Sequence, residues 1–197
     1  MDFVGRRLKQ LLICPRQAMP VLLAEGSLGQ AANVVFAAAL LGMLSGWVYL
    51  GHHPEAIPEG SSLYAGLLQQ FLRPFFTCLL WAAVSYAFAC ALGGKGKLRP
   101  LLMLFGYILV LDVLAYAYTL FRAGMELVMT EPATVLRWVD QALATGFWLW
   151  EVVLAVLAVR CAMHLSGGRA AVVVLVPMLI LSAISYIFLS AVPGITG

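Results

Sequence analysis

Five apolar stretches, each long enough to cross a membrane, dominate this sequence. Three of them contain no Lys, Arg, Asp or Glu: residues 26–54, 74–94 and 170–197. Two more, 100–121 and 141–159, are each interrupted by a single acid, Asp112 and Glu151 respectively. A helix that crosses about 30 Å of hydrocarbon needs roughly 20 apolar residues. The sequence therefore predicts five membrane spans, near 31–51, 72–92, 100–121, 141–162 and 170–191.

The composition supports this prediction and excludes several classes of protein. Hydrophobic residues make up 63% of the chain and charged residues only 11%, against about 45 to 50% and 25% in soluble domains. The connections between spans are too short for a nucleotide-binding or catalytic domain. The net charge of +3 is modest and the basic residues lie in short turns, so nucleic-acid binding is not expected. We predict one all-α, polytopic transmembrane bundle covering residues 31–192.

Residues 1–30 form a cytosolic, basic segment with its own pattern. Apolar residues recur there at helical spacing: Val4, Leu8, Leu11 and Leu12. Such a pattern is typical of a short amphipathic helix on the inner leaflet, and a frayed basic tail is the alternative. Pro15 and Pro20 are expected to break the helix before the first span.

Basic residues retained on the cytoplasmic side predict the orientation. Nine of the twelve Lys and Arg residues fall on one side of the predicted spans: Arg6, Arg7, Lys9, Arg16, Lys95, Lys97, Arg99, Arg160 and Arg169. We therefore expect a cytoplasmic amino terminus and a short outer tail at 193–197. Arg73 is expected at the outer mouth of the second span.

Short motifs in a fixed order suggest a family. They are Leu12-Ile13-Cys14-Pro15 before the first span, the turn Gly93-Gly94-Lys95-Gly96-Lys97-Leu98, Gly106-Tyr107 in the third span and Trp148-Leu149-Trp150 in the fourth. With five spans, this chain resembles the Yip-domain family of Ypt/Rab-interacting membrane proteins. The resemblance implies a five-helix bundle with a cytosolic amino terminus. It looks most like a bacterial inner-membrane member, which implies an accessory or scaffolding role without an assigned reaction.

The chain departs from that family in two respects. Similar members often carry a proline soon after the Gly-Tyr pair, whereas residues 110–112 here are Val-Leu-Asp, so the sequence offers no proline to bend the third span. Eukaryotic relatives bind small GTPases partly through longer cytosolic extensions, which this sequence does not show. We therefore do not transfer a GTPase partner from these relatives to this chain.

Asp112 and Glu151 are the strongest candidate functional residues, because an acid at the centre of a membrane helix costs about 2.5 to 3.5 kcal/mol on insertion scales. The polar face around Asp112 continues to Tyr116 and Thr119 at helical spacing. If both acids face the bundle interior, their repulsion favours a shared proton or a bound cation. Hydrogen bonds that fix the register of the helices, or contact with a separate subunit, are the alternatives.

Two further groups of residues are candidates for contacts. Ala38, Gly42 and Gly46 form a ridge of small residues that lets another helix approach closely, either within the chain or in a homo-oligomer. The basic turns suit anionic lipid headgroups; the candidates are Lys95, Lys97, Arg99 and Arg169. The turn at 93–97 lacks the spacing of a phosphate-binding P-loop.

These features favour a non-enzymatic accessory or scaffold protein that acts through helix and lipid contacts and supports an export or membrane-organising system. The alternative is a small proton- or cation-coupled transporter that uses Asp112 and Glu151. A third hypothesis, an enzyme acting on lipid, has no visible pair of nucleophile and base, and the HExxH and GxSxG motifs are absent from the sequence. No catalytic residue, cofactor or metal site is expected.

Overall fold

The computed structural model describes residues 2–52, 62–126 and 134–191, and its elements there are all α-helices. They are α1 (Asp2–Ile13), α2 (Pro15–Glu25), α3 (Leu28–His52), α4 (Leu63–Ala91), α5 (Leu98–Ile108), α6 (Val110–Glu126), α7 (Thr134–Met163) and α8 (Gly167–Ala191). Five segments are long and apolar enough to span a membrane: Leu28–Gly51, Leu63–Ala91, Leu98–Met125, Trp138–Met163 and Gly167–Ile184. The prediction of a five-span all-α bundle is confirmed. The predicted outer tail, 193–197, lies outside the described residues.

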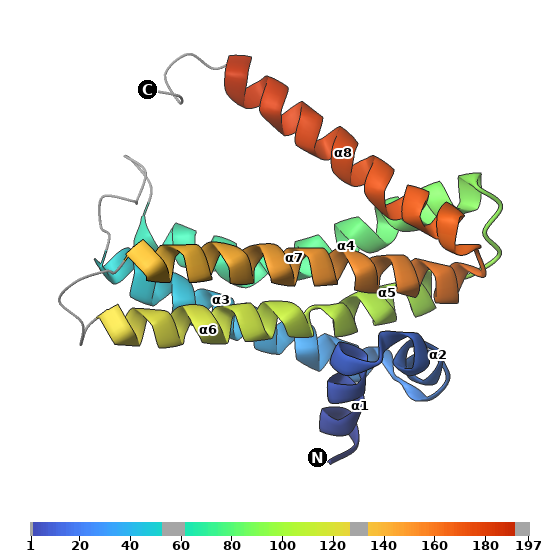
Figure 1. Ribbon diagram of the computed structural model, residues 1–197, viewed down its shortest axis with the longest axis horizontal. Coiled ribbons are helices and arrows are strands. Elements are labelled where there is room, and N and C mark those ends of the chain that lie inside the picture. The colour runs from blue at the N-terminus through green and yellow to red at the C-terminus, as the bar shows by residue number, and fades with distance from the viewer. Residues whose placement is uncertain (1, 53–61, 127–133, 192–197) are drawn as a thin grey trace.

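Helices α3, α4, α6 and α7 run along the long axis of the molecule, and α8 leans away from them (Figure 1). Helix α8 packs mainly against α7 and α4. Its first half contributes buried side chains to the core, such as Val173 and Val174. Pro177 lies inside this helix, and beyond it Leu179 and Ile184 are exposed. The second half of α8 therefore stands apart from the bundle.

The third span is divided into α5 and α6 at Leu109, although no proline is present. The backbone there has φ −62° and ψ −1°, and the helical pattern resumes where the Val113 N–H donates to the Leu109 carbonyl over 3.1 Å. Nothing in the sequence predicted this interruption. Just before the interruption, α5 packs closely against the start of α3.

That contact is made by the Gly-Tyr pair. A Cβ on Gly106 would lie 3.0 Å from the Cβ of Ala31, so glycine allows α5 to approach α3 closely. The Tyr107 hydroxyl donates to Gln30 Oε1 over 2.9 Å. Gln30 and Ser27 also cap α3 reciprocally, because each backbone N–H donates to the other's side chain. The motif thus joins α5 to the capped start of α3.

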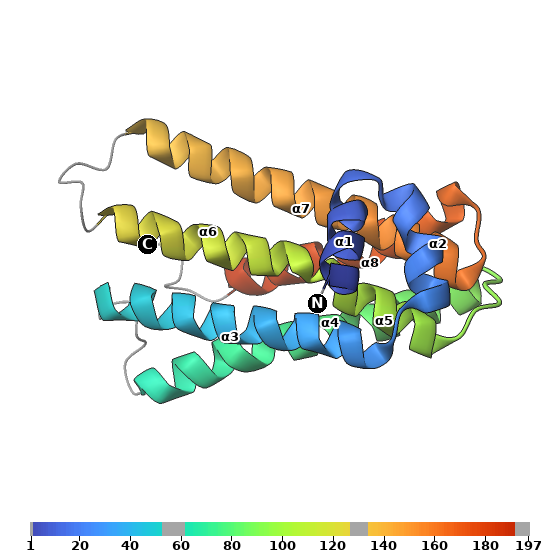
Figure 2. The same cartoon turned by 90° about the horizontal axis from the view of Figure 1, so that it is seen from below.

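The first two helices dock on the bundle. Helix α2 packs against α7 and α5 (Figure 2), and Leu11, Met19 and Leu22 are buried there. Pro15 occupies the first turn of α2, where a missing N–H costs nothing. The expectation that Pro20 breaks the helix is wrong, because α2 continues through it. Met19 and Leu22, on either side of the proline, are both buried.

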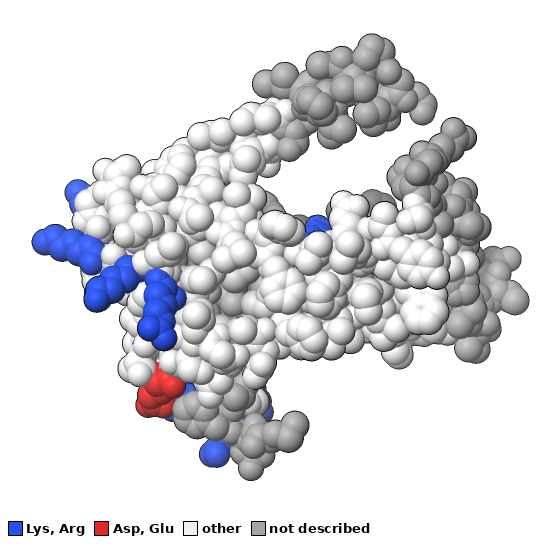
Figure 3. Space-filling model, turned by 180° about the vertical axis from the view of Figure 1, so that it is seen from behind, with Lys and Arg blue, Asp and Glu red and all other residues white. Residues whose placement is uncertain are grey.

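Two turns lie at the same end of the bundle as α1 and α2: one joins α4 to α5, and the other joins α7 to α8. Helix α4 ends in a Schellman motif, with Gly93 at φ +84° and the Gly94 N–H donating to the Ala89 carbonyl over 2.8 Å. The turn then packs on the end of α7, because the Lys95 N–H donates to the Met163 carbonyl over 3.2 Å. Lys and Arg side chains gather at this end, which we call the basic end (Figure 3).

Helix α4 begins at Leu63, well before the predicted span start at 72. Ser62 caps it, since its side chain accepts a hydrogen bond of 3.2 Å from the Ala65 N–H. Because of this earlier start, Arg73 lies ten residues inside the helix, about 15 Å along its axis. The expectation that Arg73 marks the outer mouth of this span is therefore wrong.

Candidate intramembrane polar site

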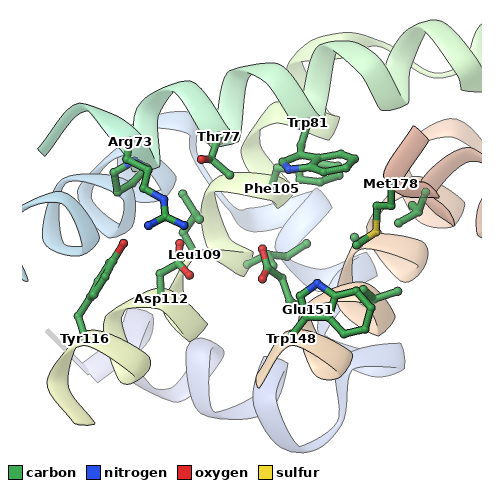
Figure 4. A pocket seen from close by; sticks show the side chains of 16 residues that line it. Arg73, Thr77, Trp81, Phe105, Leu109, Asp112, Tyr116, Trp148, Glu151 and Met178 are labelled. Carbon is green, nitrogen blue, oxygen red and sulfur yellow. The ribbon is translucent and has the colours of Figure 1, made fainter. Parts of the chain in front are cut away.

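A cavity of about 220 Å³ lies between α4, α5, α6, α7 and α8. Its lining combines charged, aromatic and aliphatic side chains (Figure 4). The residues are Arg73, Pro74, Thr77, Cys78, Trp81, Phe105, Ile108, Leu109, Asp112, Tyr116, Trp148, Glu151, Val152, Ala155, Val174 and Met178. All five spanning segments except the first thus contribute to it, and residues more than 100 positions apart in the sequence meet there.

The two intramembrane acids singled out by the sequence share this cavity. Asp112 comes from the first turn of α6 and Glu151 from the middle of α7, and both side chains are partly buried. At 1.5 Å per residue, Asp112 lies about 20 Å and Glu151 about 18 Å from the basic ends of their spans. They therefore sit at similar depth, near the middle of the bundle. The break at Leu109 comes three residues before Asp112.

Arg73 is the member of the site that the sequence prediction missed. Its guanidinium points from α4 toward Asp112 (Figure 4), and its charge interacts with both Asp112 and Glu151. The signal that would have found it is Ser62, a favourable helix cap eleven residues before the arginine. The lining residues therefore include two acids, Asp112 and Glu151, and one base, Arg73.

Tyr116 reaches the cavity because α3 leaves room for its ring. Its hydroxyl points toward Arg73 (Figure 4). A Cβ on Gly42 would lie 3.1 Å from two carbons of that ring, and a Cβ on Gly46 would lie 3.0 Å from Gln70 Cγ of α4. Ala38, the third residue of the ridge, is fully buried. The two glycines of this ridge are therefore covered by side chains of the same chain.

Thr119 does not join the site. It is exposed on α6, and its hydroxyl donates to the Ala115 carbonyl of its own helix over 3.0 Å. The preceding residue, Tyr118, donates to Asp140 over 2.6 Å, and Arg122 Nε, about one turn further along α6, lies 3.2 Å from the same carboxyl group. These bonds connect α6 to α7 near the end of the bundle opposite the basic end.

Aromatic and aliphatic side chains surround Glu151. Trp148 lies beside it one turn earlier on α7, and Trp81, Phe105 and Met178 line the same part of the cavity (Figure 4). In the described part of the chain, no group of three or more His, Cys, Asp or Glu side chains has the arrangement of a metal site. The cavity is thus lined by carboxyl and phenol oxygen atoms, by the guanidinium of Arg73 and by the faces of several aromatic rings.

The candidate lipid contacts lie far from this cavity. Lys95, Lys97 and Arg99 precede and begin α5, Arg169 lies in the first turn of α8, and all four side chains are exposed. Lys and Arg side chains project from the surface at the basic end (Figure 3). Their positions suit contact with the phosphates of anionic lipids.

Five apolar helical segments with a charged cavity at mid-depth define a multi-pass α-helical membrane protein. The Yip1 domain model matches residues 9–189, and the chain therefore belongs to the Yip1 domain family. No curated protein and no solved structure gives a match to the chain. The family resemblance inferred from the short motifs is confirmed.

Proposed function

We propose that this protein is a non-enzymatic accessory or scaffold of a bacterial inner membrane, with its amino terminus in the cytoplasm and its carboxyl terminus outside. It acts through helix and lipid contacts and supports an export or membrane-organising system. The observation that carries this proposal is the basic end, where α2 docks on the bundle with α1 packed against it, beside exposed basic residues of the α4–α5 connection and the start of α8. Membership of the Yip1 domain family, which is not known as an enzyme family, supports a non-enzymatic role.

A photo-crosslinking experiment in cells tests this proposal. A photoreactive amino acid replaces Lys95 or Lys97 at the basic end, or Phe76 on the exposed face of α4 as the control. We expect one specific membrane-protein adduct from the basic end and none from Phe76. The triple variant Lys97→Gln, Arg99→Gln, Arg169→Gln, crosslinked from position 95, is expected to reduce that adduct several-fold. Recovery of no protein adduct from either basic position would refute the scaffold proposal.

A second candidate function, proton- or cation-coupled transport, is favoured by one specific observation. Asp112, Glu151 and Arg73 line one cavity at mid-depth. Ionisable residues inside a membrane commonly mark proton or ion pathways. With both acids ionised, these three side chains carry two negative charges and one positive charge. One exchangeable proton or cation would neutralise the difference.

Flux into proteoliposomes tests the transport hypothesis. The double variant Asp112→Asn, Glu151→Gln removes both carboxylates and is expected to abolish flux that depends on a pH gradient. Glu25→Gln is the matched control, since Glu25 pairs with Arg7 at the basic end, away from the cavity. The transport hypothesis would be refuted if flux persists in the double variant, or if the wild-type protein shows no flux.

A further inference from the structure

The charges of the cavity are not evenly spread. The Arg73 guanidinium points toward Asp112, whereas Glu151 lies on the other side, toward Trp148 (Figure 4). Arg73 therefore offsets Asp112 more directly than Glu151. Glu151 also interacts with the like charge of Asp112. This end of the cavity consequently favours a positively charged occupant.

The aromatic side chains narrow the chemistry of that occupant. Trp81, Trp148 and Phe105 line the cavity together with Glu151. An ammonium group is attracted both by a carboxylate and by the negative faces of aromatic rings, most strongly by Trp. A metal cation such as Ca²⁺ instead requires six or more oxygen ligands, which two acids, Tyr116 and Thr77 supply poorly. The lining thus matches an organic ammonium ion better than a bare cation.

The volume of the cavity limits the size of the group that it can hold. At about 220 Å³, it is smaller than the pockets of roughly 300 to 1,000 Å³ that enclose drug-sized ligands. It holds a headgroup of several heavy atoms and leaves no room for a hydrocarbon chain. Any chain attached to that headgroup must lie outside.

A second hollow provides a place for the chain. A groove of about 540 Å³ runs along α4 and is lined mainly by apolar side chains, including Leu68, Leu72, Phe76 and Leu80. It shares Arg73, Thr77 and Trp81 with the cavity. The groove therefore adjoins the cavity at these three side chains, and the space beneath the diverging α8 is hollow when the molecule is viewed from behind (Figure 3).

We propose that the cavity and the α4 groove together bind an amphiphile bearing a primary or quaternary ammonium group, with the ammonium against Glu151 and Trp148 and the hydrocarbon chain along α4. This inference concerns binding at equilibrium and goes beyond both functions proposed above. Either a membrane lipid with an amine headgroup or a free lipophilic amine has this chemistry.

Binding of tritiated dodecylamine to the purified full chain in a neutral maltoside detergent tests the proposal. We expect saturable binding that dodecyltrimethylammonium displaces and that dodecanol and dodecyl phosphate, at the same mole fraction in the micelle, do not. Displacement by dodecanol would show a purely apolar site, and stronger displacement by dodecyl phosphate would show an anion site at Arg73. Either result overturns the proposal.

Variants locate the site. Glu151→Gln is expected to weaken dodecylamine binding at least tenfold, whereas Glu25→Gln leaves it unchanged. Met178→Trp fills the cavity without changing its charge and is also expected to abolish binding, which keeps the test valid if Glu151→Gln does not fold. Circular dichroism and gel filtration establish that each variant is folded. Binding at wild-type affinity in either folded cavity variant would overturn the proposal.

Competition with phosphatidylethanolamine distinguishes the two sources of the ammonium group. Displacement of dodecylamine by this lipid supports a membrane-lipid ligand. Displacement only by single-chain amines supports a free lipophilic amine. Because the assay measures binding without flux or a protein partner, its failure is distinguishable from failure of the scaffold or transport hypotheses.

Discussion

Arg73 illustrates how strongly the role of one residue depends on where its helix begins. A span that starts near 72 would place this arginine at the membrane surface, whereas in a helix capped by Ser62 it lies about 15 Å along the axis, where it lines the cavity. There its charge accompanies those of Asp112 and Glu151. A single cap thus changes a surface anchor into part of an intramembrane site.

Tyr107 makes a comparable single-residue contribution to stability. Tyr107→Phe removes the hydrogen bond of 2.9 Å to Gln30 Oε1 and is expected to lower the free energy of unfolding by about 1 kcal/mol. Thermal unfolding in detergent measures this change. Tyr64→Phe, at a side chain that is 81% exposed, is the control and should leave the unfolding temperature unchanged. Equal unfolding temperatures for Tyr107→Phe and the wild type would show that this bond contributes nothing.

At the scale of elements, close approaches at glycines decide how the helices pack. The α4–α5 turn touches the end of α7 so closely that a Cβ on Gly96 would lie 1.9 Å from the Ala162 carbonyl oxygen. At Gly42 the ring of Tyr116 occupies the space that a side chain would need. These contacts hold α4, α5, α6 and α7 at the separations that form the cavity.

Gly96→Ala is expected to destabilise the protein by about 1 to 3 kcal/mol, because the backbone of α7 must move to admit a methyl group. Gly168→Ala is the matched control in the first turn of α8, where nothing lies within 4 Å of an added Cβ. It should be neutral or slightly stabilising, since alanine favours helix more than glycine does. Chemical denaturation in detergent compares the two variants, and equal stability would contradict the packing described for this turn.

Gly42→Leu tests whether the ridge of small residues packs within one chain. A leucine there must displace Tyr116, so the monomer itself is expected to lose stability by about 1 to 3 kcal/mol. Gly51→Leu, at the end of the same helix with open space around it, should have little effect. If Gly42→Leu instead yields a monomer of wild-type stability that only fails to self-associate, the ridge serves an oligomer.

At the scale of the whole molecule, the five candidate spans found among the described residues lead us to expect the two ends of the chain in different compartments. Helices α1 and α2 lie at the basic end, and the last turns of α8 lead away from that end (Figure 1). Under the positive-inside rule, we expect the basic end in the cytoplasm.

Reporter fusions at each terminus measure this topology. A phosphatase active only outside the cytoplasm should be active at the carboxyl terminus and inactive at the amino terminus. Exchanging Lys95, Lys97, Arg99 and Arg169 for Gln is expected to produce a mixed orientation, because it removes much of the charge bias. The same substitution at Arg122 is the control, since that residue lies near the opposite end and pairs with Asp140. Activity of the reporter at both termini of the unaltered chain would contradict a five-span topology.

The sequence by itself determined the five apolar spans, their approximate centres, the all-α class and the family. Hydrophobic length is a local property, and lipid requires each spanning segment to satisfy its own backbone hydrogen bonds. The two intramembrane acids were recognisable for the same reason, because charge is rare in such segments.

Only the tertiary structure decided which side chains meet. The rotation of each helix and its depth follow from side-chain packing and from caps, which hydrophobic periodicity restricts weakly. In the structure α2 continues through Pro20, and the third span is divided at Leu109 without a proline. The structure also excludes Thr119 from the cavity and brings Arg73 into it. The cavity therefore exists because contacts between distant segments fixed the rotation and depth of helices whose lengths the sequence had already set.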